Sequence, residues 1–257
     1  IDLAAIAGNW RALAALVAPA ELAAVVKADA YGLGAARVVP ALLKAGCRTF
    51  FVATASEAAE VRALAPRAII YVLDGLLPGS AEAIAAIAAR PVLSTLEQVK
   101  EWAHFSPPRL RGVVRGERQP LSKAPEATPH PLPASGERQP ACALQLETGL
   151  NRLGLGDADV HTLASDTELL GRLDLSLVMS HLACADDPGH PMNAMQLARF
   201  RELSALLPAT PYSLAASDGL MLGKGYHFDL VRPGYALYGG QAFRGGMTPV
   251  TPVIQVH

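Results

Sequence analysis

Cysteine is scarce in this 257-residue sequence, and its three copies, Cys47, Cys142 and Cys184, show no CxxC spacing. An odd, widely spaced set predicts reduced and mostly buried thiols in a cytosolic protein, not a disulfide framework or a zinc site. No apolar run reaches about 18 residues without a breaker, which argues against a membrane-spanning helix. The chain also opens without a charged and then apolar leader, so we expect a soluble, cytoplasmic protein.

The sequence also has no excess of positive or of negative charge. Lys and Arg number 22 against 23 Asp and Glu, and no basic block occurs, so nucleic acid has no electrostatic support as a partner. The GxGxxG, Walker, HExxH and GxSxG sequences are absent too, which removes the usual support for nucleotide-cofactor and hydrolase functions. This balance favours a compact small-molecule substrate.

Short apolar segments that alternate with amphipathic ones are abundant. Strands that are apolar throughout suit a parallel sheet covered on both faces. Eight such units in about 240 residues predict an α/β fold, the closed (β/α)8 TIM barrel. After a first helix, the expected strands are 21–28, 48–54, 68–75, 91–95, 141–148, 175–183, 212–217 and 234–240, with helices at 34–46, 56–65, 79–90, 96–106, 157–172 and 193–207.

Two segments depart from this rhythm. Residues 115–140 contain six prolines and carry the string GERQP at both 116–120 and 136–140. This composition predicts a disordered insertion, which leaves the barrel on the face opposite the catalytic loops. The tail alternates in character and then stops. We therefore expect a barrel domain over 1–247 and the start of a truncated C-terminal β-domain over 248–257.

Barrel enzymes place reactive groups where strands end and the following loops begin. The first strand ends in AVVKADAYGLG, which puts Lys27 at the barrel mouth and Tyr31 four residues further on. An amine in apolar surroundings becomes a nucleophile or a base; the plain alternative is a lysine whose stem lies on apolar surface. The Tyr31 hydroxyl either reaches a phosphate or belongs to a packing aromatic.

A basic residue lies in the loop after the fifth strand and another near the end of the sixth. Arg152 lies in a Gly-flanked loop, where it clamps a carboxylate or phenolate or is simply a surface arginine. His181 sits near the exit of an apolar strand, which most often means a satisfied core histidine. No metal is predicted, because no tetrahedral spacing exists among His181, Cys184, Asp186, Asp187 and His190.

The last two units carry anion-binding candidates. Ser217 precedes a probable helix start, where it either seats a phosphate or acts as a plain N-cap. Arg232 precedes Pro233 and Gly234, a turn whose bare backbone can approach an anion. Phosphate sites after strands seven and eight recur in barrels of this kind.

Together, AVVKADAYGLG, LETGLNRLG, SHLACAD, AASDG and VRPGYALYGG resemble, in order, segments of the alanine racemases, which are fold-type III pyridoxal phosphate enzymes. The resemblance covers essentially the whole chain except 115–140. It implies a pyridoxal 5'-phosphate cofactor, interconversion of L- and D-alanine that supplies D-alanine for the cell wall, and a homodimer of the full-length protein.

The resemblance implies that Lys27 and Arg152 are the catalytic residues. Lys27 would hold the cofactor as a Schiff base and serve as the base on the D-alanine face. Arg152 would contact the cofactor's phenolic oxygen and the substrate carboxylate. Arg232 would face the pyridine nitrogen, which it cannot readily protonate because a guanidinium keeps its proton. His181 would lie beside the cofactor ring and hydrogen-bond the arginine region.

The same resemblance assigns the phosphate to Tyr31, Ser217 and the backbone of Gly234 and Tyr235. Two departures from the family pattern stand out. Gln145 occupies the place of a carbamylated lysine that many members carry seven residues before the arginine. The family's opposite-face base is a tyrosine in a C-terminal β-domain, so we expect this chain alone to bind the cofactor and to racemise negligibly.

Three alternatives remain open at this point. A single-domain pyridoxal phosphate homeostasis protein would form the lysine adduct without racemising. A related barrel decarboxylase of basic amino acids would need a cysteine in a β-domain. A degenerate, non-catalytic copy would explain the Pro-rich insertion.

Overall fold

The computed structural model describes residues 1–105, 140–240 and 250–253. Apart from Pro140, the expected insertion at 115–140 lies outside the described residues. The expected C-terminal start at 248–257 is described only over 250–253, and both remain predictions.

Parallel strands follow one another around the molecule in sequence order. The strands are β1 Glu21–Leu22, β2 Ala24–Val25, β3 Thr49–Val52, β4 Ile69–Val72, β5 Arg90–Leu93, β6 Ala141–Gln145, β7 Asp174–Met179, β8 Tyr212–Ser213 and β9 Leu230–Val231. β2 to β8 form one sheet, and β1 pairs with β9. Because β1 and β2 are two halves of one strand, the nine short strands of the described residues occupy eight positions.

Backbone hydrogen bonds close the ring between β8 and β9. The amide of Asp229 donates to the carbonyl of Tyr212 at 3.0 Å, and that of Arg232 to the carbonyl of Ala215 at 3.0 Å. On the other side of β9, Ala23 N donates to Val231 O at 2.9 Å. The predicted (β/α)8 barrel is therefore confirmed.

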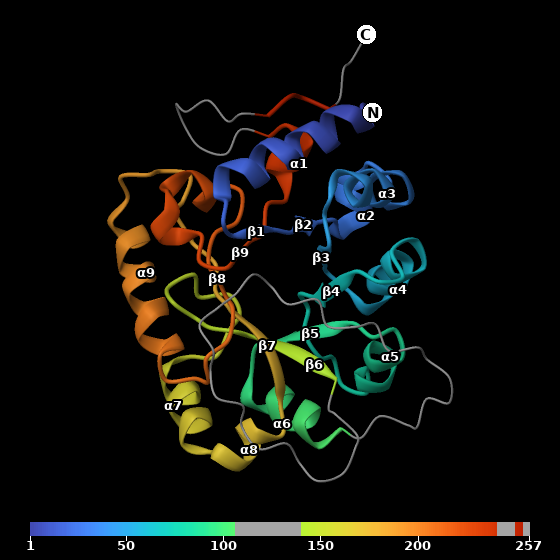
Figure 1. Ribbon diagram of the computed structural model, residues 1–257. Coiled ribbons are helices and arrows are strands. Elements are labelled where there is room, and N and C mark those ends of the chain that lie inside the picture. Colours follow the sequence, from blue (N-terminus) through green and yellow to red (C-terminus); the bar gives the residue numbers. More distant parts are fainter. Residues whose placement is uncertain (106–139, 241–249, 254–257) are drawn as a thin grey trace.

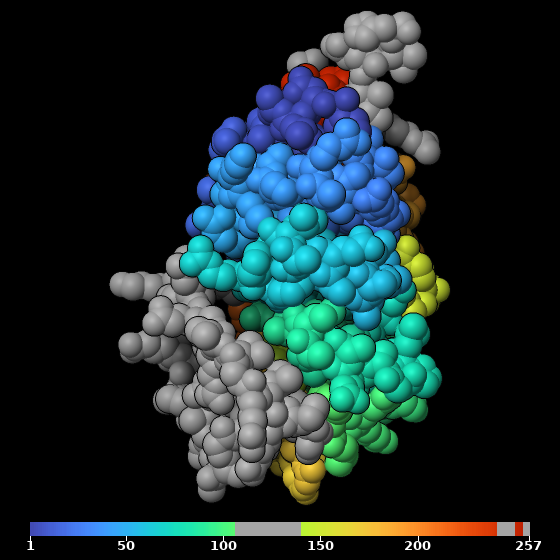
Figure 2. Space-filling view, turned by 90° about the vertical axis from the view of Figure 1, so that its right-hand side faces the viewer, coloured from blue at the N-terminus to red at the C-terminus, as the bar shows by residue number. Residues whose placement is uncertain are grey.

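Helices surround this barrel, and successive units stack along its side (Figures 1 and 2). They are α1 Leu3–Val17, α2 Lys27–Gly32, α3 Ala35–Ala45, α4 Ala55–Leu64, α5 Ala81–Ala86, α6 Leu96–His104, α7 Asp157–Ser165, α8 Thr167–Gly171 and α9 Pro191–Ser204, with 3-10 turns η1 Gly219–Leu222, η2 Lys224–Tyr226 and η3 Tyr235–Tyr238. In the described part of the chain, no helix is long and apolar enough to cross a membrane.

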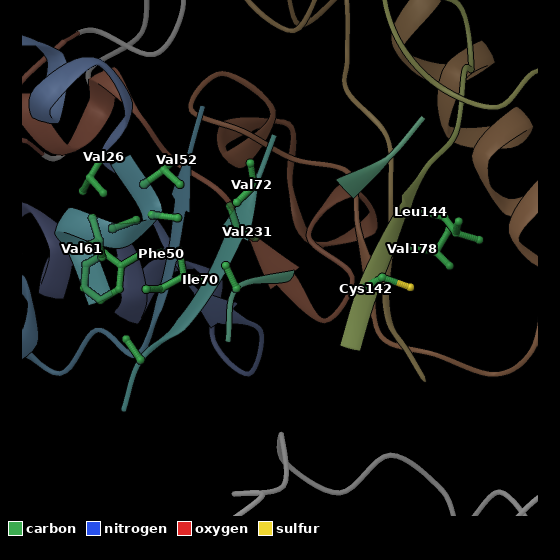
Figure 3. Close-up of a cluster of buried hydrophobic side chains, with 14 of the residues drawn as sticks. Val26, Phe50, Val52, Val61, Ile70, Val72, Cys142, Leu144, Val178 and Val231 are labelled. Carbon is green, nitrogen blue, oxygen red and sulfur yellow. The ribbon is translucent and has the colours of Figure 1, made fainter. Parts of the chain in front are cut away.

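Strand residues alternate between two cores, as the two-residue period of a strand requires. One set faces the helices and includes Phe50, Val52, Ile70 and Val72, which cluster in Figure 3. The other set fills the barrel interior: Ala23, Val25, Phe51, Tyr71, Val92, Ala143, Leu177, Met179 and Leu230. This filled interior leaves the barrel mouth as the place for polar groups.

The strand expected at 234–240 is wrong, because this segment forms η3 and the eighth strand position is β9, just upstream. Pro233 has no amide to donate, so it takes part in the ladder only as an acceptor, from Val25 N at 3.0 Å, and η3 follows at once. The helix expected at 157–172 is two helices, because the Asp166 carboxylate caps the amide of Leu169 and starts α8. The helix expected at 79–90 is the shorter α5, since Ala88 turns to a φ of 51°.

The described C-terminal residues pack along α1. Val253 is buried, and its carbonyl accepts from the amide of Asp2 at 3.0 Å. The Asn9 side chain donates to Thr251 O at 2.8 Å and accepts from Thr251 N at 2.7 Å. The start of a C-terminal β-domain over 248–257 remains a prediction.

Candidate active site

Lys27 is the first residue of α2, two residues after β2 ends at Val25, and so lies at the carboxyl end of the first strand position, as predicted. The four residues after it, Ala28 to Tyr31, all have φ between 51° and 57°, so α2 is a left-handed turn in which four consecutive residues are not glycine. A left-handed L-residue costs about 1–2 kcal/mol. A turn this costly persists only when its surroundings hold it.

Two carboxylates hold the left-handed turn at its ends. Glu57 Oε1 accepts from the amide of Ala28 at 2.7 Å. Asp29 Oδ1 accepts from the amide of Ala35 at 2.6 Å, where α3 begins. The turn thereby brings Tyr31 to Gly234, which follows the neighbouring strand β9.

Tyr31, Ser217 and Gly234 meet at one place, as the phosphate prediction requires. A Cβ built on Gly234 would lie 2.0 Å from the Tyr31 hydroxyl oxygen, so only glycine allows this approach. Buried Ser217 accepts through Oγ from Gly234 N at 3.0 Å and from Ala236 N at 3.3 Å. Because its oxygen already accepts twice, its own hydroxyl proton is available to an anion.

Two tyrosines of η3 frame this cradle. The Tyr235 hydroxyl donates to Asp218, and burial raises the pKa of both groups. Tyr238 packs against Tyr31 with ring centroids 5.0 Å apart and donates to Val25 O at 3.1 Å. Burial also raises the pKa of Tyr31, so its hydroxyl keeps the proton that an anion needs. Sequence reasoning missed Tyr238, although its spacing of three from Tyr235 was visible.

Arg232 is buried at the mouth, 3% exposed. Its guanidinium donates to Ser213 Oγ and, at 2.6 Å, to the carbonyl of Ser180. It also lies 5.9 Å from the centroid of the Phe51 ring. Burial lowers the pKa of Arg232 to about 9, which still leaves it charged at neutral pH. Ser180 and Ser213 were missed; a serine inside an apolar strand was their only signal.

His181 is the point at which the predicted residues converge. Burial, and then the positive charges of Arg232, Arg152 and Lys27, lower the pKa of His181 to about 3. Four predicted residues from four different strand ends therefore share one electrostatic neighbourhood. The imidazole is neutral at physiological pH, so it offers one donor and one acceptor nitrogen.

This depressed pKa makes stability depend on pH. The unfolded chain binds a proton at His181 near pH 6.5 and the folded chain only near pH 3, so stability is full above about pH 6.5 and is lost as the pH falls. The wild type should lose unfolding free energy between pH 7 and pH 5, and His181→Asn should lose about 1 kcal/mol less over the same interval. This value is discounted because the ring is partly exposed. Urea denaturation at both pH values measures it. Exposed His161→Asn is the control, and equal pH slopes in all three proteins would contradict the prediction.

Arg152 stands on an exposed loop that closes on itself. Leu155 N donates to Gln145 O at 2.8 Å, and Glu147 N donates to Leu155 O at 3.0 Å. Gly154, at a φ of 133°, lies so close to this backbone that a Cβ would be 2.6 Å from Glu147 N. The loop thus holds Arg152 at the mouth, while the Gln145 side chain is buried at the end of β6.

Gln196 on α9 ties this loop to His181. Its amide nitrogen donates to Thr148 Oγ1 at 3.3 Å and to His181 O at 3.0 Å, and its oxygen accepts from Ala183 N at 2.8 Å. In the sequence, Gln196 looks like one of the polar residues on the exposed face of a helix, so it was not selected from the sequence. In the described parts of the chain, no three His, Cys, Asp or Glu side chains are grouped to hold a metal ion.

Comparison with known proteins places this site in a family. The family described as "Alanine racemase, N-terminal domain" matches residues 1–242. An alanine racemase of Methylobacterium nodulans is 46% identical over 256 residues, which are 100% of this chain and 62% of that protein. One of Rhizobium meliloti is 42% identical over 99% of this chain and 60% of its own length.

A solved structure agrees with the sequence matches. The alanine racemase of Bartonella henselae, crystallised with covalently bound pyridoxal phosphate, has a TM-score of 0.84 and 35% identity over 98% of this chain and 66% of that one. The chain spans about 60% of the length of the curated relatives it matches. Because the family match covers nearly all of the chain, this protein belongs to the family of alanine racemase N-terminal domains.

Proposed function

We propose that this barrel binds pyridoxal 5'-phosphate at Lys27 and takes part in the interconversion of L- and D-alanine. The observation that carries the proposal is the meeting of Tyr31, Ser217 and Gly234 at the strand end that also presents Lys27. The positive charges of Lys27, Arg152 and Arg232, which lower the pKa of His181, agree with it. The Bartonella henselae relative, which holds the cofactor covalently, supports it.

The residues at the mouth fit the cofactor. The Tyr31 hydroxyl comes close to Gly234 only because that residue has no Cβ, and the Ser217 hydroxyl lies on the other side of the Gly234 amide. The Tyr31 and Ser217 hydroxyls and the amide of Tyr235 would hold the phosphate beside the bare backbone of Gly234, whose own amide donates to Ser217 Oγ. Arg232 would stand at the pyridine nitrogen and Arg152 at the phenolic oxygen.

When bound, pyridoxal phosphate withdraws electrons and acidifies the α-hydrogen of an amino acid. The chain's own residues would bind and orient the substrate and move the proton. Lys27 Nζ takes or returns the proton on the D-alanine face. Arg152 pairs with the substrate carboxylate. His181, being neutral, adds no positive charge beside Arg232. Arg232 stays protonated and passes no proton on.

Racemisation needs proton removal on one face and return on the other, hence two groups. In the resemblance described above, the second group is a tyrosine of the C-terminal domain. We propose that residues 1–247 contribute the cofactor site and the Lys27 face.

The setting of the full-length protein is also proposed. The curated relatives are bacterial alanine racemases, which supports a role in supplying D-alanine for peptidoglycan in the cytoplasm. A homodimer is proposed on the same family ground.

Hydrogen exchange at the substrate tests the proposal. We incubate the 257-residue chain with pyridoxal phosphate and D-alanine in deuterium oxide and follow the α-hydrogen by mass spectrometry and the configuration by chiral chromatography. With Lys27 acting on one face, D-alanine gains deuterium and stays D. A loaded chain that exchanges no α-hydrogen contradicts the proposed chemistry. Fast formation of L-alanine by the chain alone would contradict the one-face assignment.

A further inference from the structure

One carboxylate links the loops that follow the first two strand positions. Glu57 Oε1 accepts from Ala28 N at 2.7 Å, next to Lys27. Glu57 Oε2 accepts from Ala53 N at 2.7 Å, just after β3. A single side chain therefore bridges two neighbouring strand ends at the barrel mouth.

Helix capping alone does not explain this arrangement. Glu57 is the acidic half of a capping box with Thr54. Its Oε2 accepts a hydrogen bond from the amide of Thr54 at 3.4 Å. That capping bond is the longest of the three that the carboxylate accepts. Its two shorter bonds go to Ala28 and Ala53, which lie outside α4.

The position of these bonds matters because the turn at Ala28 opposes the intrinsic backbone preference of its residues. Ala28 is the first of four consecutive left-handed residues, and Asp29 fixes the far end through Ala35 N. Nothing in Ala, Asp or Tyr favours four such residues in a row. At the near end, Ala30 N donates to Val26 O at 2.9 Å, and the bond from Ala28 N to Glu57 is the side-chain contact that joins it beside Lys27.

We propose that Glu57 is a positioning residue: its carboxylate holds the left-handed turn so that Lys27 is aimed at the cofactor. The inference rests on the proposed function and deepens it. The hydrogen bonds that the Glu57 carboxylate accepts come from the backbone amides of Ala28, Ala53 and Thr54. Glu57 acts through the backbone that Lys27 shares with Ala28.

Glu57→Gln is the informative variant, because an amide has one acceptor oxygen and turns its NH2 toward the other amide donor. Two matched controls separate the competing roles. Thr54→Ala weakens the same cap and leaves both short bonds in place. Exposed Glu60→Gln makes the same charge change on the same helix.

Three measurements are made on the 257-residue chain. Hydrogen exchange of the 27–34 peptide reports the turn without cofactor. Absorbance titration gives the affinity for pyridoxal phosphate. Borohydride reduction at a series of pH values, with peptide mapping, gives the fraction of Lys27 labelled. Glu57→Gln should speed exchange and weaken affinity, each about tenfold, and shift the pH profile of labelling. Both controls should match the wild type in all three.

The outcomes separate this inference from the proposed function. Unchanged exchange and labelling in Glu57→Gln overturn the positioning role. So does an equal loss in Thr54→Ala, which would mean that only the cap matters. A wild-type chain that is not labelled at Lys27 overturns the proposed function and the inference together, and the thermal midpoint of each cofactor-free variant shows whether it is folded.

Discussion

Lys27→Ala is expected to abolish covalent uptake of pyridoxal phosphate, from about one cofactor per chain to background. Lys27 is the amine placed at the first strand end, and three further strand ends present groups to the same neighbourhood. α-Hydrogen exchange of D-alanine should fall by about 10²- to 10⁴-fold, the usual contribution of a positioned base. Borohydride reduction followed by intact-mass measurement detects the adduct.

Exposed Lys44→Ala is the matched control and should take up the cofactor as the wild type does. Lys27→Arg keeps the charge but has no amine that adds to an aldehyde, so it should also stay unlabelled. Stoichiometric reducible adduct in Lys27→Ala would show that another lysine is the attachment point.

The ends of the apolar strands pointed to Lys27, Arg152, His181 and Arg232. This was possible because a parallel strand that is buried on both faces is apolar throughout and can be recognised in the sequence. Each apolar run ends where a polar residue begins, so the mouth could be read from sequence. The failure at 234–240 has the same origin: a short apolar run predicts a strand or a tight helical turn equally well. Pro233, which can accept but not donate in a ladder, was the signal that the strand was about to end.

Other parts of the site depend on contacts that sequence spacing does not encode. The left-handed turn after Lys27 is invisible to propensity, because none of its four residues favours positive φ. Glu57 reads locally as one half of a capping box, and its bond to Ala28 joins residues 29 positions apart. Gln196 likewise reaches Thr148 across 48 positions. Such residues become evident only when the loops are seen side by side.

Gly234→Ala is expected to weaken the affinity for pyridoxal phosphate by about 10- to 100-fold, the loss of one or two hydrogen bonds to a charged group. Its Cβ would lie 2.0 Å from Tyr31 Oη and 2.9 Å from Cζ, so the tyrosine must move away from the cradle. Absorbance titration gives the affinity. Gly8→Ala, where a Cβ would have nothing within 4 Å, is the control and should bind normally.

Two comparisons assign the loss to the phosphate seat. Pyridoxal without the phosphate should lose much less affinity in Gly234→Ala, because its remaining contacts lie elsewhere at the mouth. Tyr31→Phe removes the hydroxyl and should cost about tenfold for the phosphate form. Since both changes act on one contact, the double variant should lose little more than Gly234→Ala alone. Fully additive losses, or an equal loss for pyridoxal, would mean that the cradle at Gly234 does not hold the phosphate.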